Sequence, residues 1–150
     1  MPEGSITIKK GREKSIRNRH PWIFSGSIIH AEDADPGTIV RILTQDGAFL
    51  ARGYWNPQSQ IQVRILTWEP DERIDSAFWM TRLIRAARAR GLHHLDSDDL
   101  RGTAQRIVNA ENDYLPGLII DRYGEWLVLQ ALTLGIDARK GEIVELLTDR

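Results

Sequence analysis

The chain of 150 residues contains no cysteine. This absence excludes a disulfide framework, a zinc site built from thiolates and a cysteine nucleophile. No apolar run approaches the ~20 residues that a membrane-spanning helix needs, and the N-terminus MPEGSITIKK lacks the apolar segment of a secretory signal. Apolar residues still make up 41% of the chain, which is enough to bury a core. These features predict a globular, cytoplasmic protein without a membrane partner.

The overall charge of -1 conceals an asymmetry between the two halves. Residues 1–68 hold nine Lys or Arg against six Asp or Glu, a net charge of +3, whereas residues 69–150 hold eleven against fifteen, a net charge of -4. The sign changes at Glu69-Pro70-Asp71-Glu72-Arg73, a polar segment with a proline that is typical of a linker. We therefore expect two domains, 1–70 and 71–150.

The first half has the pattern of a small β-barrel or sandwich. Polar and apolar residues alternate in 5–9 and 61–65, as in half-buried strands, and further strands are expected at 22–29, 38–43 and 48–54. Asp35-Pro36-Gly37 and Gln45-Asp46-Gly47 are turn signals. The second of these joins two strands closely enough to predict a hairpin.

The second half mixes helices with strands, so the chain as a whole is expected to be α+β. A helix capped by Asp75 or Ser76 should end at Gly91 and face the core with Met80, Leu83, Ile84 and Ala87. Strands are expected at 106–109, 118–121 and 126–132. A final helix over 137–148 should point Ile143, Val144 and Leu147 inward.

Two stretches have residue types found in metal or nucleotide sites. The segment 93–99, HHLDSDD, has metal-ligand residue types, but adjacent histidines splay apart and no distant partner is evident, so a polar loop is the better interpretation. The segment 118–124, LIIDRYG, has one glycine where a phosphate-cradling loop needs several. We expect a hairpin there and no metal site in the chain.

The most informative stretch is KKGREKSIRNRHPWIF, residues 9–24, in which six Lys or Arg fall within eleven residues. The alternation of a strand stops between Gly11 and Asn18, so a short helix is expected, and it has to end before Pro21. Trp22 follows directly, and Tyr54 and Asn56 lie on a strand expected opposite. Cations attract phosphates and aromatic rings stack on unpaired bases, so the stretch indicates RNA binding. A solvated charged surface and a core position for Trp22 are the alternatives.

Several motifs in this order resemble a known family. The segments 10–15 (KGREKS), 20–26 (HPWIFSG) and 53–61 (GYWNPQSQI) are similar to the N-terminal PUA domain of bacterial large-subunit ribosomal RNA cytosine-5 methyltransferases. The similarity continues through 108–113 (VNAEND) and 115–124 (LPGLIIDRYG), which in that family open a small central α/β domain. Trp55 stands where tyrosine or phenylalanine is expected.

The resemblance implies a PUA-type β-barrel followed by an incomplete α/β central domain, of strand-strand-helix order. Family members continue with two more strands and a Rossmann-like catalytic domain that binds S-adenosylmethionine. Methylation of cytosine carbon 5 requires a cysteine thiolate that adds to carbon 6. Because the chain has no cysteine and no glycine-rich cofactor loop, we expect an N-terminal fragment that is inactive alone, with no catalytic residue and no cofactor of its own.

Ribosomal RNA is the partner that the resemblance implies. The candidate phosphate contacts are Lys10, Arg12, Lys14, Arg17 and Arg19. The candidate stacking residues are Trp22 and Tyr54, and the same face is expected to include Arg52, Asn56 and Arg64. An open sheet edge in the incomplete central domain would favour a homodimer. Two other functions stay open: a stand-alone PUA-type RNA-binding module, and a protein-interaction module without RNA affinity.

Overall fold

The computed structural model describes residues 3–92 and 104–148 and divides the chain into two compact units, Met1–Glu72 (unit 1) and Arg73–Arg150 (unit 2). The segment 93–99, interpreted above as a polar loop, lies outside the described residues. No helix in the described ranges is long and apolar enough to cross a membrane.

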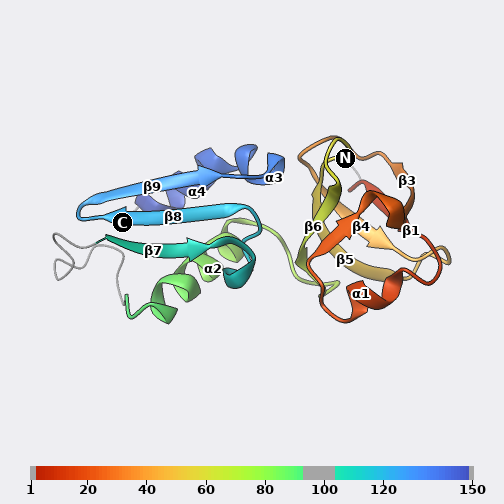
Figure 1. Ribbon diagram of the computed structural model, residues 1–150, viewed down its shortest axis with the longest axis horizontal. Helices are drawn as coiled ribbons and strands as arrows, with labels where there is room; N and C mark the ends of the chain where they lie inside the picture. Colours follow the sequence, from red (N-terminus) through yellow and green to blue (C-terminus); the bar gives the residue numbers. More distant parts are fainter. Residues whose placement is uncertain (1–2, 93–103, 149–150) are drawn as a thin grey trace. The chain divides into compact units, whose positions relative to one another are not determined.

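Unit 1 is a six-stranded sheet that curls around a core of aliphatic side chains (Figure 1). Its strands are β1 (Ser5–Ile8), β2 (Trp22–Phe24), β3 (Ile28–Glu32), β4 (Ile39–Leu43), β5 (Phe49–Trp55) and β6 (Ile61–Thr67), in the spatial order β2-β6-β5-β4-β1-β3. The β1–β4 pair is parallel and the other pairs are antiparallel. Alternate residues of β1, Ile6 and Ile8, are buried, as the alternating sequence predicts.

The hairpin predicted at Gln45-Asp46-Gly47 is confirmed, since β4 and β5 pair across it. Gly47 has a φ of 83°, a left-handed conformation that favours glycine. The single strand expected at 22–29 is wrong in one respect: the 3₁₀ turn η1 (Ser25–Ser27) divides it into β2 and β3. The division is required because β2 and β3 lie at opposite edges of the sheet.

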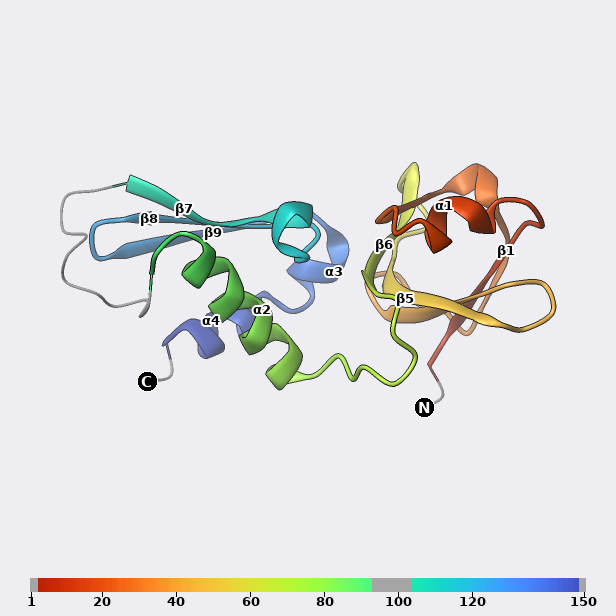
Figure 2. The same cartoon turned by 90° about the horizontal axis from the view of Figure 1, so that it is seen from below.

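Unit 2 contains a three-stranded antiparallel sheet with the order β7-β8-β9. Its elements are α2 (Ser76–Ala89), β7 (Ala104–Asn109), the 3₁₀ turn η3 (Ala110–Asp113), β8 (Leu118–Tyr123), β9 (Trp126–Ala131), α3 (Leu134–Asp137) and α4 (Lys140–Thr148). Figure 2 shows α2 and α4 on one face of the sheet. Three strands, rather than the two implied by the resemblance, precede the C-terminal helices, and the expected hairpin at 118–124 is confirmed by the β8–β9 pair.

The helices of unit 2 differ in detail from the expectation. The Asp75 carboxylate caps α2 by accepting from the N–H groups of Ala77 and Phe78. The buried face of α2 is formed by Phe78, Trp79, Leu83, Ala86 and Ala87. Ile84 is exposed, because the helix turns the face that carries Trp79 and Leu83 inward. The final helix is divided into α3 and α4, and Val144 is exposed instead of inward.

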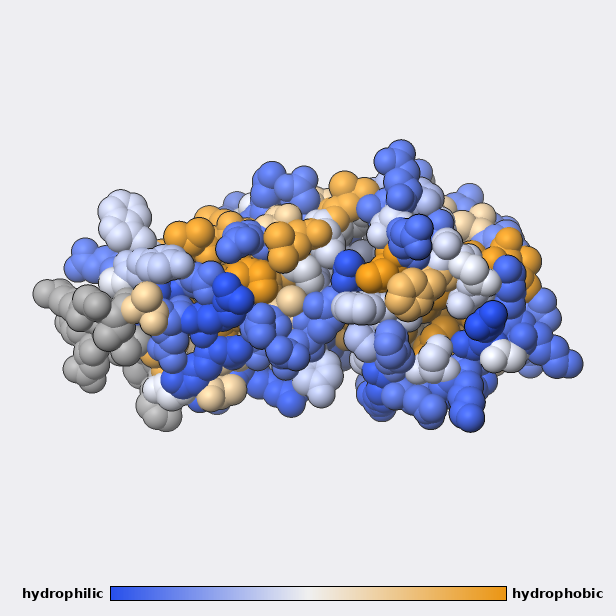
Figure 3. Space-filling model, in the orientation of Figure 1, coloured by the Kyte–Doolittle hydropathy of each residue, from blue (hydrophilic) through white to orange (hydrophobic). Residues whose placement is uncertain are grey.

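Apolar side chains also remain exposed on β9. Trp126 is 77% exposed, and Leu127 and Val128 are partly exposed. Figure 3 shows apolar surface over β8 and β9. Among the described strands, β9 pairs only with β8, so one of its edges carries backbone groups without a strand partner.

Candidate nucleic-acid interface

Helix α1 (Glu13–Arg17) carries the cations singled out in the sequence, and its position depends on unit 1. A helix of five residues is not stable by itself in water. Ile16 anchors it, because its side chain is 1% exposed and belongs to the aliphatic core. The indole Nε1–H of Trp68 donates to the carbonyl oxygen of Ile16 at 2.8 Å. The backbone N–H of His20 donates to the carbonyl of Ser15 at 3.0 Å and ties the end of the helix to the start of β2.

The cations on and before α1 point into solvent. Lys10, Arg12, Lys14 and Arg17 are all exposed, and Figure 3 shows hydrophilic surface over this helix. Lys10, Arg12 and Lys14 make no ion pair with any residue that the structure describes. Their charge is therefore available to an external anion.

Arg17 has a carboxylate in its neighbourhood. The hydroxyl of Thr44 donates to Asp46 at 2.6 Å and lowers the pKa of that carboxyl, and the charge of Arg17 lowers it further. Arg17 stays exposed, but part of its field is compensated by Asp46.

Arg19 is held more firmly than the other cations. It has a φ of 64°, its guanidinium forms an ion pair with Glu69 at 3.0 Å, and the same group lies 5.4 Å from the ring centroid of Trp68. Its side chain is 63% exposed, so it can still contribute to the positive potential of the surface. Its geometry is set by the protein rather than by a ligand.

Trp22 and Arg64 are cross-strand partners on β2 and β6. The Arg64 guanidinium lies 5.5 Å from the centroid of the Trp22 ring, within the range of a cation–π contact. Both residues are half-buried. Asn56 is half-buried as well, and its side-chain oxygen accepts from the N–H of Gln58 at 3.1 Å, which fixes the turn between β5 and β6.

Of the expected contact residues, Tyr54 is buried and Arg52 is bonded within the protein. Tyr54 is 3% exposed and presents no ring face for stacking, because β5 is a central strand and α1 packs against it. Arg52 donates to the Glu3 carboxylate at 3.1 Å and to the carbonyl of Glu72 at 2.9 Å. Its guanidinium connects segments of unit 1. The candidate RNA-binding surface therefore includes neither Tyr54 nor Arg52.

Two aromatic residues were missed in the sequence, His20 and Phe24. Both are exposed, and both contact the ring of Trp22 edge to face, at centroid distances of 6.0 and 6.4 Å. The signal that could have identified them is the period of two in HPWIF, in which only Ile23 is buried.

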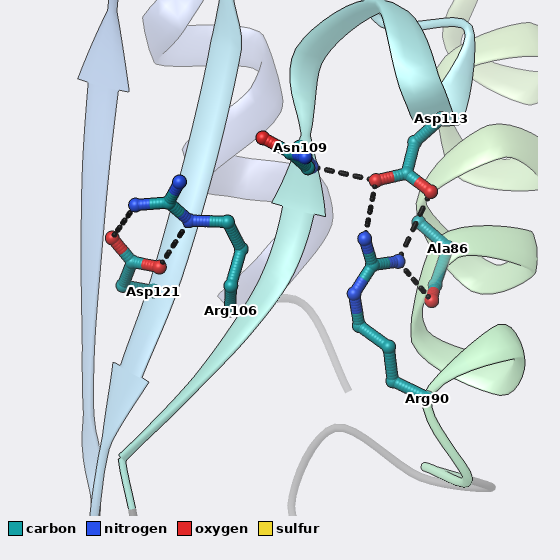
Figure 4. A network of polar contacts seen from close by, with 6 residues as sticks. All are labelled: Ala86, Arg90, Arg106, Asn109, Asp113 and Asp121. Atoms are coloured by element: carbon teal, nitrogen blue, oxygen red, sulfur yellow. Dashed lines mark hydrogen bonds and ion pairs between the residues drawn. The ribbon is translucent and has the colours of Figure 1, made fainter.

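Two ion pairs of unit 2 are shown in Figure 4. Arg106 forms a two-point ion pair with Asp121 at 2.8 and 3.1 Å, and these hydrogen bonds lower the pKa of the Asp121 carboxyl. Arg90 forms another with Asp113, which also accepts from the backbone N–H of Asn109 at 2.6 Å. In the ranges 3–92 and 104–148, no three His, Asp or Glu side chains gather in a way that could hold a metal ion.

Comparison with protein families indicates the class of domain to which unit 1 is similar. Residues 6–68 match the family described as PUA-like domain, which covers nearly all of unit 1 and includes α1 and β2. Unit 1 is therefore similar to a PUA-like domain over this range.

The particular relatives are ribosomal RNA methyltransferases. The chain is 44% identical over 146 residues to ribosomal RNA large subunit methyltransferase I of Shewanella frigidimarina, covering 93% of this chain and 35% of the relative. It is 40% identical over 144 residues to the protein of the same name from Salmonella arizonae, covering 95% and 35%. The resemblance to large-subunit ribosomal RNA methyltransferases is confirmed, and the chain spans about a third of the length of these relatives.

Solved structures share the fold. A putative SAM-dependent methyltransferase from Streptococcus mutans superposes with a TM-score of 0.74 at 15% identity, over 95% of this chain and 36% of the other. A putative methyltransferase complexed with SAH gives 0.76 at 16% identity, with the same coverage. At these identities the similarity establishes the fold, including both units.

Proposed function

We propose that this chain is the RNA-holding part of an S-adenosylmethionine-dependent methyltransferase that acts on cytosine carbon 5 in large-subunit ribosomal RNA. The observation that carries the proposal is the cluster of exposed cations on α1, adjoining aromatic residues of β2, within a PUA-like domain. The names of the relatives and the cytosine-5 resemblance of the motifs support it. The domain that binds the cofactor and performs methyl transfer is proposed to lie outside these 150 residues, in a cytoplasmic enzyme.

In this proposal Lys10, Arg12, Lys14 and Arg17 contact phosphates. Each contact releases counterions from the RNA, so affinity has to fall as salt rises. With about three of these four cations in contact with a single strand at one time, the slope of log K against log salt is about -2. Because α1 is fixed by Ile16 and Trp68, the cations hold the RNA backbone in one position relative to unit 1.

The test is a triple charge reversal, Arg12→Glu with Lys14→Glu and Arg17→Glu. RNA binding is measured by fluorescence anisotropy between about 50 and 500 mM salt, over which a slope of -2 corresponds to a change of about a hundredfold in affinity. The triple variant is expected to bind weakly, with a slope between zero and about -0.7, because Lys10 is the one proposed contact left unchanged. A matched variant with the same change in net charge reverses Arg73, Arg85 and Arg88 of unit 2, and it is expected to keep the parental slope. Equal binding by the parent and the folded α1 variant would refute the assignment.

The exposed strand β9 supports a second candidate, a protein-interaction surface that includes a homodimer contact. Its Trp126 side chain is 77% exposed, and one edge of the strand has no partner strand among the described residues. Sedimentation velocity distinguishes the two functions. Self-association that is lost on Val128→Lys, without RNA binding by the parent, would favour this candidate.

A further inference from the structure

Strand β2 and His20, two residues before it, carry a row of aromatic side chains on one outward face. His20, Trp22 and Phe24 occupy alternate positions, while the intervening Ile23 is 2% exposed and faces the core. Because side chains alternate across a strand, the three rings share the face opposite to Ile23. β2 is also an edge strand of the sheet. Outward positions on edge strands are usually charged or interrupted by proline, because apolar side chains there favour aggregation. An aromatic row at this position therefore indicates a binding surface.

Neighbouring rings of the row contact one another edge to face, and Phe24 is more exposed than Trp22. Trp22 stands nearly perpendicular to both neighbours, at 80° to His20 and 82° to Phe24. Arg64 lies beside the Trp22 ring, which is half-buried. Phe24 is 46% exposed at the end of the row. Its ring is therefore supported at one edge while much of its surface faces solvent.

The surroundings of Phe24 are polar and partly cationic. The backbone N–H of Ser25 donates to the carbonyl of Gln60 at 3.0 Å, which brings the exposed amide residues of the β5–β6 turn next to the end of β2. The Lys9 ammonium donates to the carbonyl of Gly26 at 2.9 Å, two residues beyond Phe24. Amide side chains can bond base edges, and an ammonium can approach a phosphate. An apolar protein partner would not use either group.

We infer that Phe24 is a stacking platform for an unpaired base, which makes this surface a site for single-stranded RNA. The inference rests on the proposed RNA-binding function and names the form of RNA that is bound. A base in a duplex has both faces covered by its neighbours, so only an unpaired or terminal base can lie on the Phe24 ring. Trp22 is the positioning residue that holds Phe24 edge to face, and the α1 cations hold the adjoining phosphates.

The experiment compares two RNA probes with four proteins. The probes are a fluorescein-labelled 12-nucleotide single strand and the same strand annealed to its complement, with anisotropy measured at one fixed salt concentration. The proteins are the parent, Phe24→Ala, Phe24→Tyr and the control Ile29→Ala, which removes an apolar side chain of similar exposure (44%) from the opposite edge strand. Circular dichroism and melting temperature check that each variant is folded.

We expect the parent to bind the single strand more tightly than the duplex. Phe24→Ala should weaken single-strand binding on the order of tenfold, the usual scale for one base stacked on an aromatic ring, and should weaken duplex binding much less, since only the terminal bases of the duplex have a free face. Phe24→Tyr should restore the affinity, since the ring face is kept, and Ile29→Ala should behave as the parent.

Unchanged single-strand binding by folded Phe24→Ala, or an equal loss for both probes, would overturn the inference while leaving the RNA-binding function in place. A parent that prefers the duplex would overturn it as well, even if Phe24→Ala fails to fold. A parent that binds neither probe would overturn the proposed function and the inference together. If Phe24→Ala changes only the sedimentation coefficient, the row is a protein contact and the inference is wrong.

Discussion

Replacing Ile16 by alanine is expected to destabilise unit 1 by about 3 kcal/mol and to disorder the helix that carries the cations proposed to bind RNA. The side chain is 1% exposed, and the substitution removes three carbon atoms at about 0.8 kcal/mol each, plus a cavity term, within the usual 2–5 kcal/mol for such changes. Since a helix of five residues cannot persist without tertiary contacts, the loss should concentrate on α1. RNA affinity should fall although no charge has changed.

Thermal denaturation followed by circular dichroism gives the overall effect, which we expect to be a fall of about 12 °C or more in the unit 1 transition. Because two units need not unfold together, hydrogen exchange by mass spectrometry is used to locate the change. Amides of residues 13–19 should lose protection first. Ile29→Ala is the control, since Ile29 is 44% exposed, and its effect should lie within about 0.5 kcal/mol. A loss below about 1 kcal/mol for Ile16→Ala, or unchanged exchange in α1, would refute the view that Ile16 anchors the helix.

Two further predictions concern residues that hold the sheets together. Gly53→Ala should prevent β5 and β6 from pairing normally, because a Cβ at this position would overlap the backbone carbonyl of Arg64; a melting temperature equal to that of the parent would contradict this. Asp121→Asn should cost about 1 kcal/mol at pH 7, since Arg106 is half-exposed and the pair is screened. Because the folded-state pKa of Asp121 is lowered, this contribution is present above the ordinary aspartate pKa, near 4, and disappears as pH falls through the lowered value. Urea denaturation at pH 7 and pH 3 measures the difference in free energy of unfolding between the parent and Asp121→Asn. A difference that is larger at pH 3 than at pH 7 would contradict this prediction.

Two segments of unit 1, α1 and β2, suit two different kinds of contact. The α1 cations are exposed and held in place through Ile16 and Trp68, so they suit contacts that depend on charge and position. The aromatic row on β2 suits contacts that depend on an accessible ring face. Phosphate contacts carry little sequence information, whereas exposed bases can be discriminated. We therefore expect the α1 variants to alter salt dependence and the β2 variants to alter the preference between RNA forms.

The sequence by itself determined most of the strands and helices, the hairpin at Gln45-Asp46-Gly47 and a helix cap at Asp75 or Ser76, but not the division of 22–29 into β2 and β3. These features depend on local alternation, turn residues and capping, which act over a few neighbouring positions. The resemblance of the motifs also identified the relatives that the comparisons confirmed.

Only the tertiary structure decided which side chains are available. Tyr54 lies on a strand whose partners and covering helix come from distant segments, so its burial is not visible in the local pattern. Arg52 is likewise occupied by Glu3, 49 positions away. Phe24 is exposed because it lies on the face of β2 opposite to the buried Ile23, and Ile84 is exposed because α2 turns Trp79 inward instead. Sequence patterns define the faces of a strand or helix, but long-range packing determines which face is covered and what solvent can reach.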